Sequence, residues 1–143
     1  GNPALRSIFV NYLHATELNN GTIFAYVAAQ AAYENGADWV RQLTEYVWEN
    51  VLLVRDFLSE QMPLIHPMIP EATYMVWLDC RALGMSQKEL RHFFYHEAKV
   101  VMNDGTAFGP GGEGFMRMNL ATPRSNVVKA LEGIKSAFDK LGE

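Results

Sequence analysis

A glycine-rich stretch, GPGGEG (residues 109–114), lies shortly before a lone arginine, Arg117. Its glycines match the G-x-G-x-x-G fingerprint, which binds the pyrophosphate of dinucleotides. That chemistry requires a helix to begin directly after the loop, because the free N–H groups of the first helical turn hold the phosphates. Residues 115–120 instead alternate in character, which predicts a strand. We therefore expect a flexible loop between two strands and no nucleotide site.

Arg117 is the residue best suited to chemistry in this region. It lies in the middle of an apolar run, two residues before Asn119. A buried guanidinium needs a partner, because an unpaired buried charge is costly, and its planar fork matches the geometry of a carboxylate. The partner is either an acidic side chain of this chain or the carboxylate of a substrate, and the residues alone leave both open.

Other reactive side chains form weaker patterns. His92 and His96 are four residues apart on an expected helix, so they share a face. Zinc needs at least a third ligand, and the run HFFYHE lacks the HExxH arrangement of metalloproteases, so we expect no metal site. Cys80 lies in an expected strand with no histidine near it in sequence, and we expect a buried, inert thiol.

The composition is that of a single cytoplasmic domain. The chain has 143 residues, of which 49% are hydrophobic, and a net charge of −4. Lysine and arginine are not clustered, so no nucleic-acid partner is expected. The sequence contains no run of 18 apolar residues, so no membrane span is expected, and its N-terminus lacks the pattern of a signal peptide. One cysteine excludes an internal disulfide, which fits a reducing compartment.

Apolar periodicity predicts the elements that position Arg117. The first 20 residues look extended or loosely helical, residues 21–36 are alanine-rich and helical, and residues 37–61 form the clearest amphipathic helix. Further elements are expected in the order strand or loop, strand, helix, strand, strand, helix, at residues 64–70, 73–80, 86–98, 99–104, 114–122 and 122–141. The last helix should be capped by Thr122, with Pro123 as its first residue. The predicted fold is α+β, a small mixed or antiparallel sheet packed on helices, with residues 37–61 as a long connecting helix.

Three stretches together resemble the C-terminal part of fold-type-I enzymes that depend on pyridoxal 5′-phosphate (PLP). They are AAQAAYENGADWV, PEATYMVWLDCRALG and GTAFGPGGEGFMRMNLATPR, at residues 28–40, 70–84 and 105–124. Within this aminotransferase superfamily (class I/II), the chain is most similar to the cystathionine β-lyase group of MalY and PatB. The resemblance implies that residues 1–20 connect to a large domain and that residues 21–143 form the small domain, including the long linking helix.

The resemblance also implies roles for residues near the glycine loop. Arg117 matches the arginine that binds the α-carboxylate of an amino-acid substrate, and Phe108 and Gly109 match the loop at the mouth of the substrate site. Asn19 and Asn20 lie in a stretch that approaches the neighbouring active site in the family's dimers, so a homodimer is implied for the full-length enzyme.

The cofactor implied by the resemblance is PLP, whose attachment lysine lies in the family's large domain. The five lysines of this chain lack the family's Ser-x-x-Lys context, so we expect no catalytic residue here and an inactive chain when it is alone. The implied activity is that of a C–S β-lyase or an aminotransferase. The alternative is a self-sufficient α+β amino-acid-binding or interaction module. A broad apolar surface on the helices at residues 21–61 would favour the first interpretation, and a polar one the second.

Overall fold

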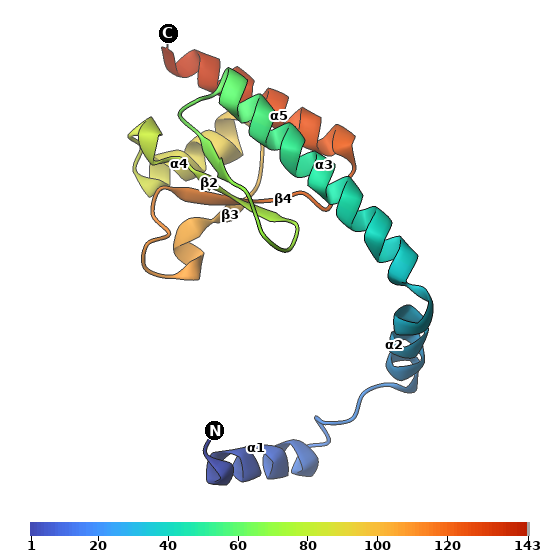
Figure 1. Ribbon diagram of the computed structural model, residues 1–143. Helices are drawn as coiled ribbons and strands as arrows, with labels where there is room; N and C mark the ends of the chain where they lie inside the picture. Colours follow the sequence, from blue (N-terminus) through green and yellow to red (C-terminus); the bar gives the residue numbers. More distant parts are fainter. Residues whose placement is uncertain (143) are drawn as a thin grey trace. The chain divides into compact units, whose positions relative to one another are not determined.

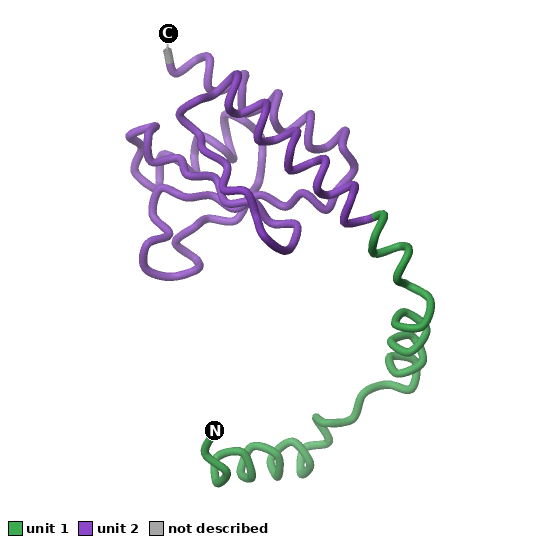
Figure 2. Tube along the Cα trace, in the orientation of Figure 1, with its two compact units in different colours: residues 1–42 green, residues 43–143 purple. Residues whose placement is uncertain are grey.

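The computed structural model describes residues 1–142 and divides into two compact units, Gly1–Gln42 and Leu43–Glu143 (Figures 1 and 2). The first unit contains helices α1 (Pro3–Ala15) and α2 (Ile23–Asn35) and the start of α3 (Ala37–Gln61). Helix α1 is more regular than expected, because the Asn2 side chain accepts a hydrogen bond from the backbone of its first turn. The division falls inside α3, and the expected domain boundary between residues 20 and 21 stays a prediction.

The second unit is built on a four-stranded sheet. Its strands are β1 (His66–Met68), β2 (Met75–Asp79), β3 (Asn103–Asp104) and β4 (Phe115–Asn119). They lie in the order β1-β2-β4-β3, and every neighbouring pair is antiparallel. The period of two along β2 and β4 directs Val76, Leu78, Met116 and Met118 into the core, and the intervening residues to the opposite face.

Helices cover one face of this sheet. These are the part of α3 in the second unit, α4 (Gln87–His92) with the π-helical turn that continues it (Phe93–Glu97), and α5 (Arg124–Asp139) (Figure 1). Short 3-10 turns occur at Arg81–Leu83, Gly105–Phe108 and Lys140–Gly142. The α+β class and the antiparallel sheet are confirmed, with one continuous core between the helices and the inner sheet face.

Three details of the expected elements were wrong. The strand expected over residues 99–104 is only two residues long, since Val101 is 82% exposed and only Asn103 and Asp104 pair with β4. The cap of α5 is Pro123 and not Thr122, so the helix begins one residue later than expected. The periodicity of residues 37–61 also places Val40 on the apolar stripe of α3, but Val40 is exposed in the first unit.

None of the helices among residues 1–142 is long and apolar enough to cross a membrane.

Candidate functional site

The face of the sheet opposite the helices, here called the outer face, carries Arg117. The strand register places Met68, Trp77, Arg117 and Asn103 in one row across all four strands. Side chains of this row are half-buried or exposed, whereas their neighbours along β2 and β4 are buried on the other face. A guanidinium therefore lies at the centre of the sheet face that no helix of the second unit covers, on a strand that is hydrogen-bonded on both sides.

The surroundings of Arg117 are aromatic and neutral. Its Nη2 donates a hydrogen bond to Asn103 Oδ1 at 3.1 Å. Its guanidinium carbon lies 4.1 Å from the centre of the Phe108 ring and 6.0 Å from that of Trp77, within reach of cation–π attraction. The two rings themselves meet edge to face at 5.2 Å. The structure therefore brings two of the expected site residues, Arg117 and Phe108, into direct contact.

Arg117 has no acidic partner within the described residues 1–142, although other arginines of the chain form ion pairs. Its Nε is buried and has no hydrogen-bond partner. A buried donor without a partner costs about 1–3 kcal/mol, and more when the group is charged. The sequence left two kinds of partner open for Arg117, an acidic side chain of this chain or a substrate carboxylate. Among the described residues the first kind is absent, and the Nε–H donor of Arg117 has no acceptor.

A shallow hollow of about 310 Å³ lies beside this arginine. It is lined by Met68, by the rings of Trp77, Phe108 and Phe115, and by the backbone of residues 109–112. Phe108 is 48% exposed, and Gly109, another expected site residue, follows it with a φ of 111°. The hollow and the arginine therefore share two aromatic side chains and form one continuous surface.

The glycine loop has a tightly closed base. A Cβ atom at Gly105 would lie 2.2 Å from the carbonyl oxygen of Gly112, and one at Gly112 would lie 2.0 Å from that of Gly105. At the tip, Gly109 and Gly111 have positive φ angles and open space around them. The glycines thus serve close backbone contact at the base and left-handed conformations at the tip. The expectation of a flexible loop did not include this contact.

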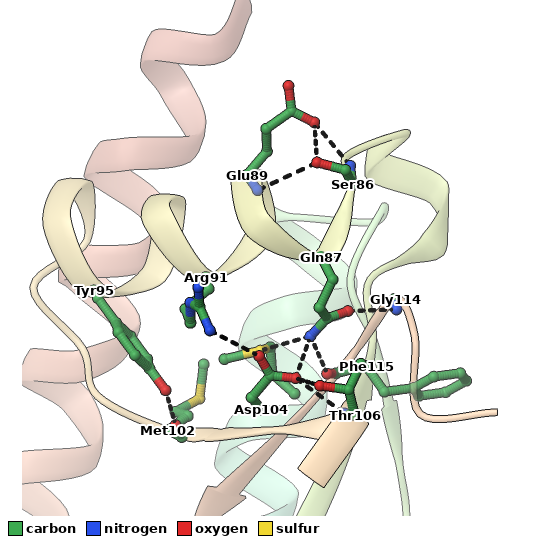
Figure 3. A network of polar contacts seen from close by, with 11 residues as sticks. Ser86, Gln87, Glu89, Arg91, Tyr95, Met102, Asp104, Thr106, Gly114 and Phe115 are labelled. Atoms are coloured by element: carbon green, nitrogen blue, oxygen red, sulfur yellow. Dashed lines mark hydrogen bonds and ion pairs between the residues drawn. The ribbon is translucent and has the colours of Figure 1, made fainter. Parts of the chain in front are cut away.

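A polar network holds the ends of the loop against α4 (Figure 3). Gln87 Nε2 donates to Asp104 Oδ1 at 2.7 Å, and Gln87 Oε1 accepts from the backbone N–H of Gly114 at 2.8 Å. Asp104 Oδ1 also accepts from Thr106 N and Oγ1. Burial alone raises the pKa of Asp104, but the hydrogen bonds from Thr106 and Gln87 and the charge of Arg91 outweigh it and lower that pKa. Asp104 is therefore a carboxylate in the folded chain.

A second arginine near the outer face is already neutralised. Arg81 Nε and Nη2 donate to the two carboxylate oxygens of Asp79 at 2.9 and 2.6 Å. These hydrogen bonds lower the pKa of Asp79, although burial opposes the shift. Arg81 also lies 4.9 Å from the centre of the Phe115 ring. Sequence reasoning missed this pair, for which the Asp-x-Arg spacing at the end of a strand was the available signal.

The remaining candidates lie elsewhere. Burial, with a contribution from the charge of Asp79, raises the pKa of the Cys80 thiol to about 12, which agrees with an inert residue. The rings of His92 and His96 stack at 4.9 Å, and no group of three metal-binding side chains occurs among the described residues. Asn20 bonds to Glu17 in the first unit, so Asn19 and Asn20 stay candidates by resemblance only.

The chain has five lysines. They lie on the helical side of the sheet or in its connections, at Lys88, Lys99, Lys129, Lys135 and Lys140. None of them lines the hollow beside Arg117.

The α+β class of this fold is the one that the resemblance implied. No family model matches the chain. It is 37% identical over 133 residues to cystathionine β-lyase PatB of Bacillus subtilis, covering 93% of this chain and 34% of that protein. It is 31% identical over 138 residues to MalY of Escherichia coli, covering 96% of this chain and 35% of MalY.

A solved structure gives the same result for the fold. Cystalysin from Treponema denticola, whose crystal structure contains a pyridoxal 5′-phosphate cofactor, superposes with a TM-score of 0.86 at 31% identity. The match covers 98% of this chain and 36% of cystalysin. The chain is thus a homologue of the cystathionine β-lyase group within the PLP-dependent aminotransferase superfamily. It spans about a third of the length of these relatives.

Proposed function

We propose that this chain is the substrate-carboxylate-binding small domain of a PLP-dependent C–S β-lyase or aminotransferase that acts on an amino acid. The observation that carries the proposal is Arg117, a guanidinium with a buried, unpaired Nε and no carboxylate partner among the described residues. The likeness to cystathionine β-lyase PatB supports the lyase class. A likeness to an aspartate aminotransferase of Pyrococcus horikoshii, 28% identical over 130 residues, supports the aminotransferase class. PLP in such enzymes withdraws electrons from the carbon that loses its proton, and the lysine that holds it would come from a large domain.

In this proposal Arg117 binds the α-carboxylate and thereby fixes the orientation of the α-carbon. Its fork can donate hydrogen bonds to two carboxylate oxygens at once, and the strand on which it lies is held in place from both sides. Asn103 holds Nη2, and the rings of Phe108 and Trp77 keep water from the face of the guanidinium. A less hydrated site strengthens the attraction between the two charges.

The first unit supports a domain that works within a larger assembly. None of the side chains of residues 1–42 is buried, although many are large and apolar. Exposed examples on α1 and α2 are Leu5, Ile8, Phe9, Ile23, Phe24 and Val27. Such a surface is rare on a self-sufficient protein and typical of an interface. It favours contact with a large domain, and with a second subunit in a homodimer, over an independent module. A cytoplasmic location stays a prediction from composition.

The test uses the whole enzyme that carries this domain. Arg117→Gln should raise KM for the amino acid by roughly 10- to 100-fold, because a hydrogen bond to a charged group contributes about 1.5–3 kcal/mol. KM for the decarboxylated amine analogue should not change, since the amine has no carboxylate to bind. Arg55→Gln, at an exposed arginine of α3 paired with Asp56, is the matched control. Equal effects on acid and amine, or none on either, would refute the role of Arg117.

The chain alone provides a second test. Mixed with PLP and reduced with borohydride, it should show no stoichiometric adduct on a single lysine, and it should not turn over an amino acid. A specific adduct would mean that the chain holds the cofactor itself and would contradict its role as the carboxylate-binding domain.

A further inference from the structure

The two side chains that contact Arg117 from the loop side flank a single residue, Asp104. Asn103, which accepts the hydrogen bond of Arg117, precedes Asp104 directly, and the 3-10 turn that ends at Phe108 follows it. Asp104 caps this turn by accepting from Thr106 N at 2.9 Å and Thr106 Oγ1 at 2.7 Å. The position of the Asp104 carboxylate therefore determines where both neighbours of the guanidinium lie.

One side-chain amide connects Asp104 to the far end of the loop. Figure 3 shows Gln87 projecting from the first turn of α4 to a point between Asp104 and Gly114. Its amide nitrogen donates to Asp104 Oδ1 at 2.7 Å, and its amide oxygen accepts from Gly114 N at 2.8 Å. Only a side chain that both donates and accepts can make these two bonds, which glutamate, methionine and lysine cannot do. Gln87 thus joins the start of the loop to its end.

The helix that carries Gln87 is itself firmly placed. Ser86 and Glu89 form a capping box at the start of α4, and Leu90 is buried in the core. Arg91 of the same helix lies 3.8 Å from the other oxygen of Asp104. Because α4 is fixed, Gln87 holds the loop in one place, and the loop in turn holds the Phe108 ring over the guanidinium of Arg117.

We infer that Gln87 is a positioning residue of the carboxylate site, because its amide fixes both ends of the 105–114 loop and thereby places Phe108 against Arg117. Gln87 Nε2 also donates to the carbonyl oxygen of Phe115 at 3.4 Å and lies 3.9 Å from Met116 Sδ, so it acts on the site through the loop and the start of β4. The consequence for substrate binding rests on the proposed function, whereas the effect on the loop does not. The two parts are therefore tested separately.

The first experiment measures the loop in the full 143-residue chain. Gln87→Met keeps the length of the side chain but loses both hydrogen bonds, and Lys88→Met on the next, exposed residue of α4 is the control. Hydrogen exchange of the Gly114 amide should be roughly fivefold or more faster in Q87M than in K88M. In a W39F/W48F background, acrylamide should also quench Trp77 more strongly in Q87M. Unchanged exchange and quenching would overturn the inference.

A second variant separates lost hydrogen bonds from misfolding. Gln87→Glu keeps an acceptor for Gly114 N but loses the donor and places a negative charge beside Asp104. We expect the Gly114 amide to stay better protected in Q87E than in Q87M, while Trp77 quenching rises in both. Equal exposure of Gly114 in the two variants would show that the bonds described here do not hold the loop.

The third experiment measures binding in the whole enzyme. Q87M should raise KM for the amino acid by roughly three- to tenfold, with kcat changed less than twofold and KM for the amine analogue unchanged. The same substitution should have no further effect in an R117Q background. If R117Q changes KM for the amino acid and for the amine analogue equally, the proposed function fails. The role of Gln87 in placing the loop is then tested by the hydrogen-exchange data alone. If R117Q does separate the acid from the amine and Q87M does not, Gln87 has no positioning role in binding.

Discussion

The junction between β4, which carries Arg117, and helix α5 depends on a buried amide in α3. Asn50 is the one polar side chain fully buried among the described residues. Its Nδ2 donates to the carbonyl oxygens of Leu120 and Thr122 at 3.1 and 3.2 Å, and its Oδ1 accepts from Arg124 Nε at 3.2 Å. The proline that caps α5 has no side-chain acceptor, so Tyr46 Oη accepts from Arg124 N at 2.6 Å, and Asn50 orders the rest of this junction. Replacing it should loosen the end of the strand that positions the arginine.

The cost of Asn50→Leu follows from the three bonds. The Leu120 carbonyl bond is buried, and losing its donor costs about 1–3 kcal/mol. The bonds to Thr122 and Arg124 are only partly buried, and each contributes about 0.5–1.5 kcal/mol. Burying a leucine side chain offsets part of this loss. We expect a net loss of about 2–4 kcal/mol, a large fraction of the 5–15 kcal/mol typical of a domain. Asn50→Asp should cost more, since it turns a carboxylate toward two carbonyl oxygens.

Urea unfolding of the 143-residue chain, followed by circular dichroism, measures this cost. The control is Asn126→Ala, which removes an exposed amide bonded to Thr122 Oγ1 and should change the unfolding free energy by less than about 0.5 kcal/mol. The slope of the transition should stay the same in both variants, because the exposed area on unfolding does not change. An Asn50→Leu loss no larger than that of the control would refute the reasoning.

Two further predictions concern residues at the end of β2. Burial and the charge of Asp79 raise the pKa of Cys80 to about 12, so a thiol reagent should label the native chain far more slowly than the urea-unfolded chain, and equal rates would contradict the burial described here. Hydrogen bonds from Arg81 lower the folded pKa of Asp79 below its unfolded value, so their stabilisation is present above about pH 4 and is lost as the pH falls through the folded pKa. Asp79→Asn should therefore flatten the acid side of the curve of unfolding free energy against pH, and an unchanged curve would contradict this pairing.

Local patterns predicted the long helix and the central strands correctly. Helix α3 begins and ends where expected, because Gly36 stops the preceding helix and Pro63 lies just beyond its last turn. Strand β4 was visible from its alternation. The start of α5 was not, because the backbone N–H of its first residue, Arg124, donates to the hydroxyl of Tyr46, 78 residues earlier in the chain. A cap supplied by a distant side chain leaves no signal in the local sequence.

The candidate site divides in the same way. Arg117 could be found because a charged residue in an apolar strand requires an explanation. Phe108 was expected in the site from the resemblance alone, and Asn103 was not expected there, since it lies beside Arg117 only when β3 pairs with β4. Gln87 gave no signal at all, because its partners lie 17 and 27 residues away along the chain. The sequence therefore shows the guanidinium of Arg117, whereas only the structure shows the contacts that position it.

The neutrality of the residue beside Arg117 decides how the site can work. A carboxylate at position 103 would satisfy the guanidinium within the chain, as Asp79 satisfies Arg81, and would leave little reason for a ligand carboxylate to bind. The amide of Asn103 instead orients one nitrogen without neutralising the charge, and the aromatic ring of Phe108 covers the guanidinium without donating or accepting a strong hydrogen bond. The domain therefore carries the cost of an unpaired buried Nε in its free state. In the proposed function, a substrate carboxylate that bonded to this nitrogen would remove that cost, and the relief would add to the affinity for the substrate.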